Sequence, residues 1–414
     1  MRSLAIVVAL LAGAACSSKA SSSDRPDATP VSDGSSVHDS GEDTRAAGKD
    51  GGHEAGSPAD AGSDARIQDA GAPDQASEAS SHEDSGVSDA GVADGCAPGP
   101  MGEPPDLACT GLYADWATKT VAANVHEYDP GLHLWSDGAV KTRWISLPTA
   151  KGIDAGNMDE WTFPIGTRLW KQFVVDGVLI ETRFEWKMAE ASWYLTTYRW
   201  SADLSSAPEL TTGQTNVNAQ GYEIPDQFAC TECHAGRMDS VLGFEAVALS
   251  SPNATLALTG TTPAAITLDS LVTAGWLSNA PAAPLTIPGS ATASTALGYL
   301  HMNCGVSCHN SGNGMAQSTG FHTRLDVAKL ATVAATDTVT TGVGQTSQFD
   351  IPGQAKSYLL EPNNLAQSAA YYRMSVRDGV DDAGLNAQMP PIVTHLVDDA
   401  GVADIAAWIN AGCQ

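Results

Sequence analysis

Residues 167–200 carry the strongest fold signal in the chain, because they contain three consecutive strand-like runs. TRLWKQFVV (167–175) is followed by Asp176-Gly177 and then by VLIETRFEW (178–186) and WYLTTYRW (193–200). Aromatic and β-branched residues favour strands, and Asp-Gly between two such runs is typical of a tight hairpin turn. Together with KTRWISL (141–147), they predict antiparallel hairpins that form a β-sandwich or a small barrel over about residues 110–225.

The chain that follows Ala235 has a different pattern. Strand signals fade, Ala and Gly become more frequent, and helices are expected at 265–276, 292–303, 325–333 and 399–411. An α+β multidomain fold is therefore predicted, in which a sandwich-like β part precedes a mostly α-helical part. Its expected parts are a β-rich domain (96–245), a connecting segment (246–290) and a helical domain (291–414).

The composition separates this body from the chain before it. The 414 residues carry 48 acidic and 21 basic side chains, a net charge of −27, and all 26 aromatic residues lie after residue 95. Such an acidic chain is not expected to bind nucleic acid, which needs clustered Lys and Arg. Residues 17–95 hold 17 acids against 5 bases among Ser, Ala and Gly. They predict a disordered acidic tether, because little apolar surface is available to offset the chain entropy.

The first residues predict export. Arg2 precedes the apolar run LAIVVALLAGA (4–14), which ends in small residues just before Cys16. The run is too short to span a bilayer core of about 30 Å, so residues 1–16 read as a secretory signal. The Cys after small residues resembles the lipobox of bacterial lipoproteins, although Gly13 stands where Leu is usual. That resemblance implies a lipid anchor on Cys16 and, with Ser17, an outer-membrane location; the alternative is a secreted chain that loses Cys16.

Cys230-Thr-Glu-Cys233-His234 is a complete C-x-x-C-H motif. Two thiols at this spacing can form thioethers with the two vinyl groups of one haem, and the adjacent imidazole then binds the iron. In an exported chain the motif predicts covalently attached haem c, with His234 as the proximal ligand. The alternative interpretation is a disulfide between Cys230 and Cys233.

Cys304-Gly-Val-Ser-Cys308-His309 is a similar motif with one additional residue between the cysteines. A helical segment precedes it, and Met389-Pro390-Pro391 and the 399–411 helix follow it. This order resembles a class I cytochrome c domain, which implies a second haem c with His309 and Met389 as axial ligands. A disulfide between Cys304 and Cys308 is the alternative here, and zinc at either motif would need a fourth ligand from the fold.

The other cysteines and the remaining axial ligand are less determined. Cys96 and Cys109 lie 13 residues apart and are expected to form a disulfide, which leaves Cys413 free, although Cys413 could pair with either. The sixth ligand of the first haem is not evident from the sequence. Its candidates are His126, His133, Met158, Met188, Met238 and His301. An open sixth position would allow catalysis rather than electron transfer alone.

Several short stretches between about 130 and 411 add to the motifs. They are Leu134-Trp135-Ser136-Asp137-Gly138-Ala139, Trp161-Thr162-Phe163-Pro164, Gly166-Thr167, Glu181-Thr182-Arg183, Leu242-Gly243-Phe244, Tyr299-Leu300-His301, Asn303-Cys304 and Met389-Pro390-Pro391. With Cys230 to His234, they resemble a family of exported two-haem c-type cytochromes in which a β-rich part precedes the first motif. The LWSDGA stretch itself predicts a tight turn capped by Asp137, with the Trp135 indole packed under it. A ligand-facing loop is the alternative.

These observations predict an extracytoplasmic c-type cytochrome with two haems, tethered to the outer membrane and active in electron transfer. Its acidic surface would attract a basic redox partner. Two alternatives stay open. One is an oxidoreductase with an open first haem, and the other is a haem-free surface lipoprotein that binds carbohydrate or protein through its β part.

Overall fold

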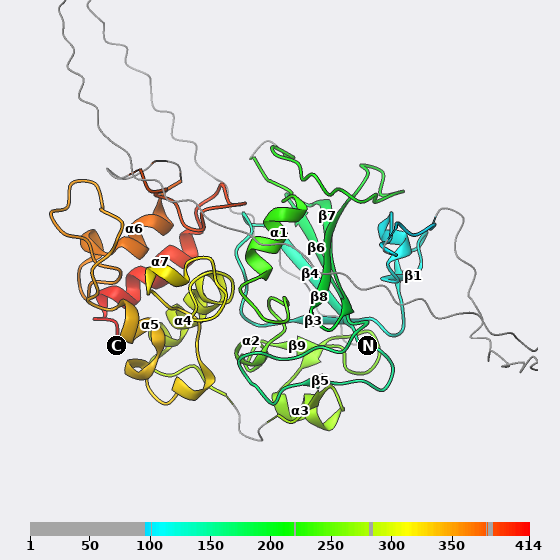
Figure 1. The fold of residues 1–414 in the computed structure, drawn as a ribbon, viewed down its shortest axis with the longest axis horizontal. Helices are drawn as coiled ribbons and strands as arrows, with labels where there is room; N and C mark the ends of the chain where they lie inside the picture. Colours follow the sequence, from blue (N-terminus) through cyan, green and yellow to red (C-terminus); the bar gives the residue numbers. More distant parts are fainter. Residues whose placement is uncertain (1–95, 101, 219–220, 281–284, 378, 380–383) are drawn as a thin grey trace, which may run out of the picture. The chain divides into compact units, whose positions relative to one another are not determined.

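The computed structural model describes residues 96–414 except 101, 219–220, 281–284, 378 and 380–383 (Figure 1). The predicted signal segment, the lipidated Cys16 and the acidic tether lie outside the described residues. Among the described residues, none of the helices has the length and apolar composition that a membrane span requires.

The strand-like runs form one antiparallel sheet of seven strands, in the order β10-β9-β3-β4-β6-β7-β8 (Figure 1). Its strands are β3 (His126–Asp129), β4 (Val140–Ser146), β6 (Arg168–Val175), β7 (Val178–Ala189), β8 (Ser192–Arg199), β9 (Thr255–Leu256) and β10 (Ala264–Ala265). The β6–β7 hairpin turns at Asp176 and Gly177, whose φ angles of +51° and +77° are those of a tight hairpin turn. The antiparallel β-rich part predicted from the sequence is therefore confirmed.

The arrangement of this part differs from the predicted sandwich or barrel. Two further pairs of strands are small: β1 (Tyr113–Asp115) with β2 (Thr120–Val121), and β5 (Ile153–Asp154) with β11 (Leu277–Ser278). No second large sheet is present in the described ranges, because irregular segments and short helices cover the sheet instead. The segment 246–290, expected only to connect two domains, contributes β9 and β10 to the sheet edge.

Alternation along the strands gives the sheet two buried faces. Trp144, Trp170 and Phe184 are neighbours on one face, where they pack against Leu107 and Leu112 of the N-terminal segment. The other face buries Ile145 and Leu169 together with Phe244, Leu249 and Leu271, which follow the first Cys-His motif. Both faces therefore hold apolar cores, and the second core brings the motif region onto the sheet.

Helices make up most of the regular structure after residue 226. They are α1 (Gln227–His234), α2 (Ala246–Leu249), α3 (Leu268–Thr273), α4 (Ala291–Leu300), α5 (Asp337–Gly342), α6 (Ala369–Ser375) and α7 (Asp399–Asn410). The helices expected near 292–303 and 399–411 form, and that at 265–276 is shorter. The helix expected at 325–333 does not form; a 3₁₀ turn, Val327–Lys329, lies there, and a second one, Val333–Ala335, begins at its end.

The helices α4 and α7 cross closely in this region. A Cβ atom placed on Gly401 would lie 2.2 Å from the ring of Tyr299, so only glycine allows this approach. Leu297, Ile405 and Trp408 are completely buried in the core beneath the crossing. Asp398 begins α7 by accepting a hydrogen bond from the Gly401 amide at 3.1 Å.

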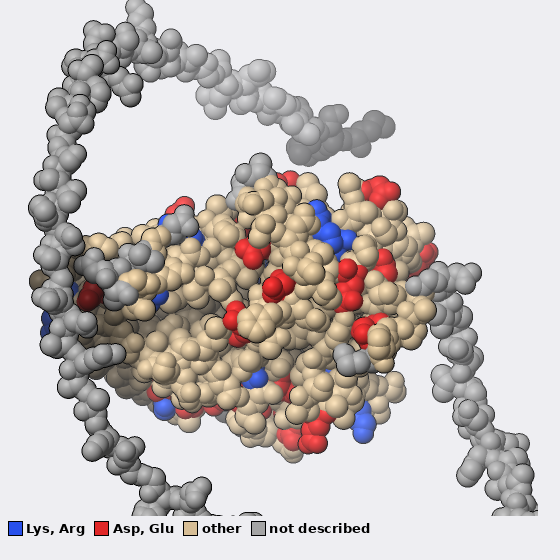
Figure 2. Space-filling view, turned by 45° about the horizontal axis from the view of Figure 1, so that its top comes forward, with Lys and Arg blue, Asp and Glu red and all other residues tan. Residues whose placement is uncertain are grey.

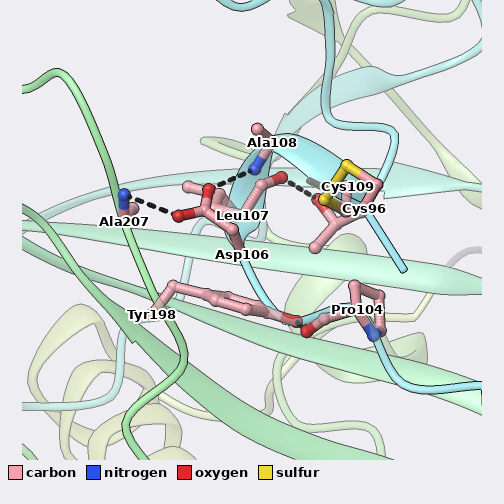
Figure 3. Close-up of a disulfide and its surroundings, with 9 residues drawn as sticks. Cys96, Pro104, Asp106, Leu107, Ala108, Cys109, Tyr198 and Ala207 are labelled. Atoms are coloured by element: carbon pink, nitrogen blue, oxygen red, sulfur yellow. Dashed lines mark hydrogen bonds between the residues drawn. A yellow bond between two sulfur atoms is a disulfide. The ribbon is translucent and has the colours of Figure 1, made fainter. Parts of the chain in front are cut away.

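A disulfide joins Cys96 and Cys109, as expected (Figure 3). Cys413 is a buried free thiol. The segment that the disulfide closes is attached to the sheet region, because Tyr198 of β8 donates a hydrogen bond to the Pro104 carbonyl at 2.8 Å. The disulfide therefore fastens the start of the described chain over the sheet.

Candidate functional site

The first motif lies on α1. The Asp226 side chain caps this helix by accepting from the Ala229 amide at 2.7 Å, and Gln227 donates to the Leu195 carbonyl of β8 at 2.9 Å. Cys230 and Cys233 are free thiols, and burial raises the pKa of both to about 11. The structure thus does not contain the alternative disulfide, and both sulfur atoms remain protonated thiols.

The imidazole of His234 has a defined orientation. Its Nδ1 lies 2.5 Å from the Ser240 carbonyl oxygen, which can only accept, so Nδ1 carries the proton. The lone pair is therefore on Nε2, which is 4.0 Å from Oε1 of Glu185. Burial lowers the pKa of His234, which keeps the ring neutral. A neutral imidazole with Nδ1 bound to a carbonyl is the usual arrangement of a metal-ligating histidine.

A buried ion pair holds the loop that supplies this carbonyl. Lys187 of β7, 1% exposed, places its Nζ 2.6 and 2.8 Å from the two carboxylate oxygens of Asp239. The Trp193 indole also donates to Asp239 at 2.8 Å. Because Asp239 immediately precedes Ser240, the sheet sets the position of the carbonyl that orients His234.

A π-helical turn accommodates the additional residue of the second motif. The helix α4 continues into the π turn His301–Gly305, where the Val306 amide bonds to the His301 carbonyl. The His309 amide likewise donates to the Cys304 carbonyl at 2.7 Å, five residues back. A π turn accommodates one residue more than an α turn, so His309 keeps a backbone bond to the first cysteine of its motif despite the longer spacing.

The second motif repeats the chemistry of the first. The Nδ1 atom of His309 donates to the Phe321 carbonyl at 3.1 Å, and burial lowers the pKa of His309 to about 4. Cys304 and Cys308 are free thiols, and burial raises the pKa of Cys304 to about 12. Each motif therefore presents two thiols and one neutral imidazole with Nε2 available.

Cys304, Cys308 and His309 line a cavity of about 380 Å³ together with Met389. The distal ligand expected 80 residues after His309 is thus in the same cavity as the motif. The Met389 amide donates to the Arg373 carbonyl at 2.8 Å, which attaches this loop to α6. Met374 and Met315 line the cavity as well, although neither belongs to a motif in the sequence.

Cys230, Cys233 and His234 line a second cavity of about 160 Å³. Strands β4, β6 and β7 supply charged side chains to its wall: Lys141, Arg143, Lys171, Arg183 and Glu185. Glu185 is almost completely buried, and its Oε2 has no hydrogen-bond partner in the described part of the chain. The composition of these strands predicted β structure only, although charged residues recur at every second position on this face of β4 and β7.

The six predicted candidates for the sixth ligand do not line this cavity. The ring nitrogens of His301 are both engaged, because Nδ1 accepts from the Leu325 amide at 3.0 Å and Nε2 lies 3.3 Å from Oε1 of Glu245. Met158 is buried in the core of the sheet, and Met238 is 75% exposed. The thioether that does line the cavity is that of Met302, which the sequence did not indicate.

The two cavities adjoin. Asn303, Cys308, Pro390 and Pro391 line both of them. A Cβ atom on Gly236, two residues after His234, would lie 2.0 Å from the carbonyl oxygen of Ser307 in the second motif. The two motifs are therefore in direct backbone contact, although about 70 residues separate them in the sequence.

The LWSDGA stretch connects both sites. The predicted turn forms, with the Ala139 amide bonded to the Ser136 carbonyl at 2.9 Å. Its function as a cap differs from the prediction, because the Asp137 carboxylate accepts from the amides of the loop after Met389 rather than from its own turn. Trp135 lines the first cavity, and its amide donates to Asn303 beside Cys304 at 2.6 Å.

The structure gives no support to the zinc alternative. In the described ranges, no group of three or more His, Cys, Asp or Glu side chains could hold a metal ion.

Comparisons of the chain with family models, curated proteins and solved structures find no match.

Proposed function

We propose that this chain is an extracytoplasmic c-type cytochrome that binds two haems and transfers electrons. The observation that supports the proposal best is the convergence of both motifs on adjoining cavities, each with two free thiols and one neutral imidazole. Cys230 and Cys233 would hold one haem, and Cys304 and Cys308 the other. His234 and His309 would be the proximal ligands, with Met389 as the distal ligand in the second cavity.

The protein's own contribution is to hold these groups in position. The carbonyls of Ser240 and Phe321 take the Nδ1 protons and leave Nε2 free on each imidazole. Haem iron, when bound, would accept and donate single electrons. Since the cavities share Cys308 and Asn303 in their walls, an electron would pass between neighbouring sites without crossing a separate protein layer.

The fold of the last part supports a class I cytochrome c-like domain at 291–414. A helix leads into the second motif, Met389 follows in a loop, and the terminal helix α7 crosses α4 at Gly401 and Tyr299. This order is the one that the resemblance to a class I cytochrome c domain implies. Export, a lipid anchor on Cys16 and a basic redox partner attracted by the net charge of −27 complete the proposal.

A haem-dependent oxidoreductase is the second candidate, and the wall of the first cavity favours it. Besides His234, the described residues that line this cavity include no histidine and a single methionine, Met302, whereas β4, β6 and β7 supply several charged side chains. An open sixth position beside charged groups would allow a small substrate to bind. A ligand-sensitive five-coordinate spectrum for one haem would support this candidate, and two six-coordinate spectra would exclude it.

The test is a pyridine haemochrome assay with intact-mass analysis on the full chain, produced with the c-type maturation machinery. Two haems per chain are expected, with one lost in the Cys230→Ser/Cys233→Ser variant and the other in Cys304→Ser/Cys308→Ser. Cys413→Ser is the matched control, because Cys413 is buried outside both cavities and should leave both haems in place. Colourless protein with unmodified thiols would reject the proposal.

A further inference from the structure

Four cations of the sheet line the first cavity side by side. Arg143, Lys171 and Arg183 are direct cross-strand neighbours on β4, β6 and β7, and Lys141 lies two positions before Arg143 on the same face of β4. We call Lys141, Arg143, Lys171 and Arg183 the cation ladder. Like charges directly opposite one another destabilise a sheet, so their gathering requires a compensating group.

Only two of the four basic side chains in the cation ladder, Lys171 and Arg183, have a carboxylate at hydrogen-bond distance. The Nζ atom of Lys171 lies 2.6 Å from Glu185, and Arg183 lies 2.7 Å from Glu181. Arg143, 6% exposed, has its ion-pair partner Asp129 at 3.9 Å, and Asp129 also binds His133 at 2.7 Å.

The remaining cation, Lys141, meets neutral groups instead. Its Nζ donates to the Ser136 hydroxyl at 2.8 Å and to the Leu134 carbonyl, and no ion pair of Lys141 occurs among the described residues. Burial, followed by the charges of Arg143, Arg183 and Lys171, lowers the pKa of Lys141 well below its ordinary value. Two of the four basic side chains on this wall, Lys141 and Arg143, therefore have no carboxylate at hydrogen-bond distance, and an anion bound beside Lys141 would favour its charged form.

This concentration of positive charge is unusual for so acidic a chain. On the surface visible in Figure 2, acidic side chains lie among neutral ones and outnumber the basic ones. The body nevertheless places four of its cations in one cavity wall. Burying uncompensated charge is costly unless a partner of opposite sign is present. A bound anion with two negative groups would supply what the protein's own acids do not.

We propose that the cation ladder binds a ligand with two carboxylates. These two carboxylates would be the propionates of the first haem, an assignment that rests on the proposed function. A free small dicarboxylate beside that haem is the other source of the same chemistry.

The topology fits the propionate source. The thioether bonds use the vinyl edge of a haem, so its propionates lie at the opposite edge. The helix α1, which carries Cys230 and Cys233, packs on β8, whereas Lys141 and Arg143 lie on β4, three strands away in the sheet order. Three strand spacings correspond to about 14 Å. The cysteines and the uncompensated cations therefore lie toward different ends of the cavity wall.

The experiment compares haem-loaded full chains. The variant Lys141→Met/Arg143→Met removes two cations from the ladder, and Lys329→Met/Lys356→Met removes two from the surface as the matched control. Lys329 pairs with Asp337 outside the cavity, and Lys356 is exposed. Haem at each motif is measured by peptide mass, both midpoint potentials by redox titration, and succinate binding by calorimetry and haem absorbance.

Two results support the proposal and distinguish the sources. If propionates occupy the ladder, succinate does not bind, and the ladder variant lowers the potential of one haem while the control does not. Loss of nearby positive charge makes the added electron less favourable. If a free dicarboxylate is the ligand, wild type binds succinate, and the ladder variant weakens binding about tenfold or more, because each charge-assisted hydrogen bond is worth about 1.5–3 kcal/mol.

Unchanged potentials and unchanged succinate binding in the ladder variant would overturn the proposal. Should the double variant not fold, the single variant Lys141→Gln carries the same comparison, with Lys141→Arg as the charge-conserving rescue. Wild type without haem at Cys230 and Cys233 would refute the proposed function instead. In that case the succinate titration of the same protein still decides whether the ladder binds a dicarboxylate.

Discussion

The Asp137 carboxylate accepts a hydrogen bond from the backbone amide of His395 at 2.8 Å, across 258 residues of sequence. Its other oxygen accepts from the Leu396 amide at 3.1 Å, and the Trp135 indole donates to the Leu396 carbonyl at 3.1 Å. The turn that begins β4 thus holds the loop that follows Met389. This contact ties the sheet to the second cavity.

Removing the Asp137 side chain should therefore loosen the loop after Met389. We expect Asp137→Ala to lower the free energy of unfolding by about 3 kcal/mol, because the backbone amides of His395 and Leu396 lose a charged, buried acceptor. Asp137→Asn should cost less, since Asn keeps one acceptor and tolerates the φ angle of +49°. Urea unfolding measures both, with the exposed Glu190→Ala as control. Equal stabilities of Asp137→Ala and the control would contradict the contact.

The contact between the two motifs gives a second prediction. A methyl group at position 236 would lie 2.0 Å from the Ser307 carbonyl oxygen, so Gly236→Ala forces the motifs apart. We expect a loss of about 1–3 kcal/mol in stability, as for other overpacked sites, together with lower haem content. Gly156→Ala is the control, because the nearest atom to its Cβ is an exposed side-chain oxygen at 3.2 Å. Full haem loading and wild-type stability in Gly236→Ala would rule out the close approach.

Local patterns were enough to predict the four long strands β4, β6, β7 and β8 and the disulfide, because each depends on neighbouring residues. The single sheet was not predictable, since β9 and β10 have two residues each and carry no periodic signal. The helix expected at 325–333 was wrong: Asp326 caps a turn there, but the turn ends at Lys329, and a second short turn, Val333–Ala335, follows it.

The wall of the first cavity also required more than local patterns. The cation ladder depends on the register of three strands, and one strand does not reveal which of its charges face a neighbour's. The contact of Asp137 with the 395–396 backbone joins positions 258 residues apart. Such pairings are tertiary and have no signature in a single sequence.

The buried pair of Lys187 and Asp239 should control the orientation of His234. Breaking a buried ion pair by removing one partner costs about 3–5 kcal/mol, so Asp239→Ala is expected to destabilise the chain by that amount and to reduce haem at the first motif only. The double variant Lys187→Met/Asp239→Leu should recover much of the stability without restoring haem content. Unfolding curves and peptide mass separate the two effects. Equal loss of haem at both motifs would mean that the pair has only a general structural function.

Glu245 gives the stability a defined dependence on pH. Burial alone would raise its pKa, but the hydrogen bond from His301, the charge of Arg237 and the bonds from backbone amides lower it to about 2. The unfolded value is 4.5, so the carboxylate stabilises the fold above pH 4.5, and this contribution is lost as the pH falls toward 2. A shift of this size corresponds to about 3 kcal/mol. We expect Glu245→Gln to lose about that much at pH 7 and little at pH 2, in urea titrations with Glu190→Gln as control.

Three methionines line the second cavity, and the proposed ligation selects one of them. Met389 lies in the loop held by Arg373 and Asp137, whereas Met374 is buried on α6 and Met315 is 54% exposed. A thioether ligand raises the reduction potential of a haem relative to other axial ligands. Met389→Leu, which keeps the volume, is therefore expected to abolish the far-red methionine-to-iron band and to lower the midpoint potential of one haem. Met374→Leu is the matched control and should preserve both. If Met374→Leu removes the band instead, the sixth ligand lies on α6, and the assignment of Met389 is wrong even though the cavity and its cysteines remain as proposed.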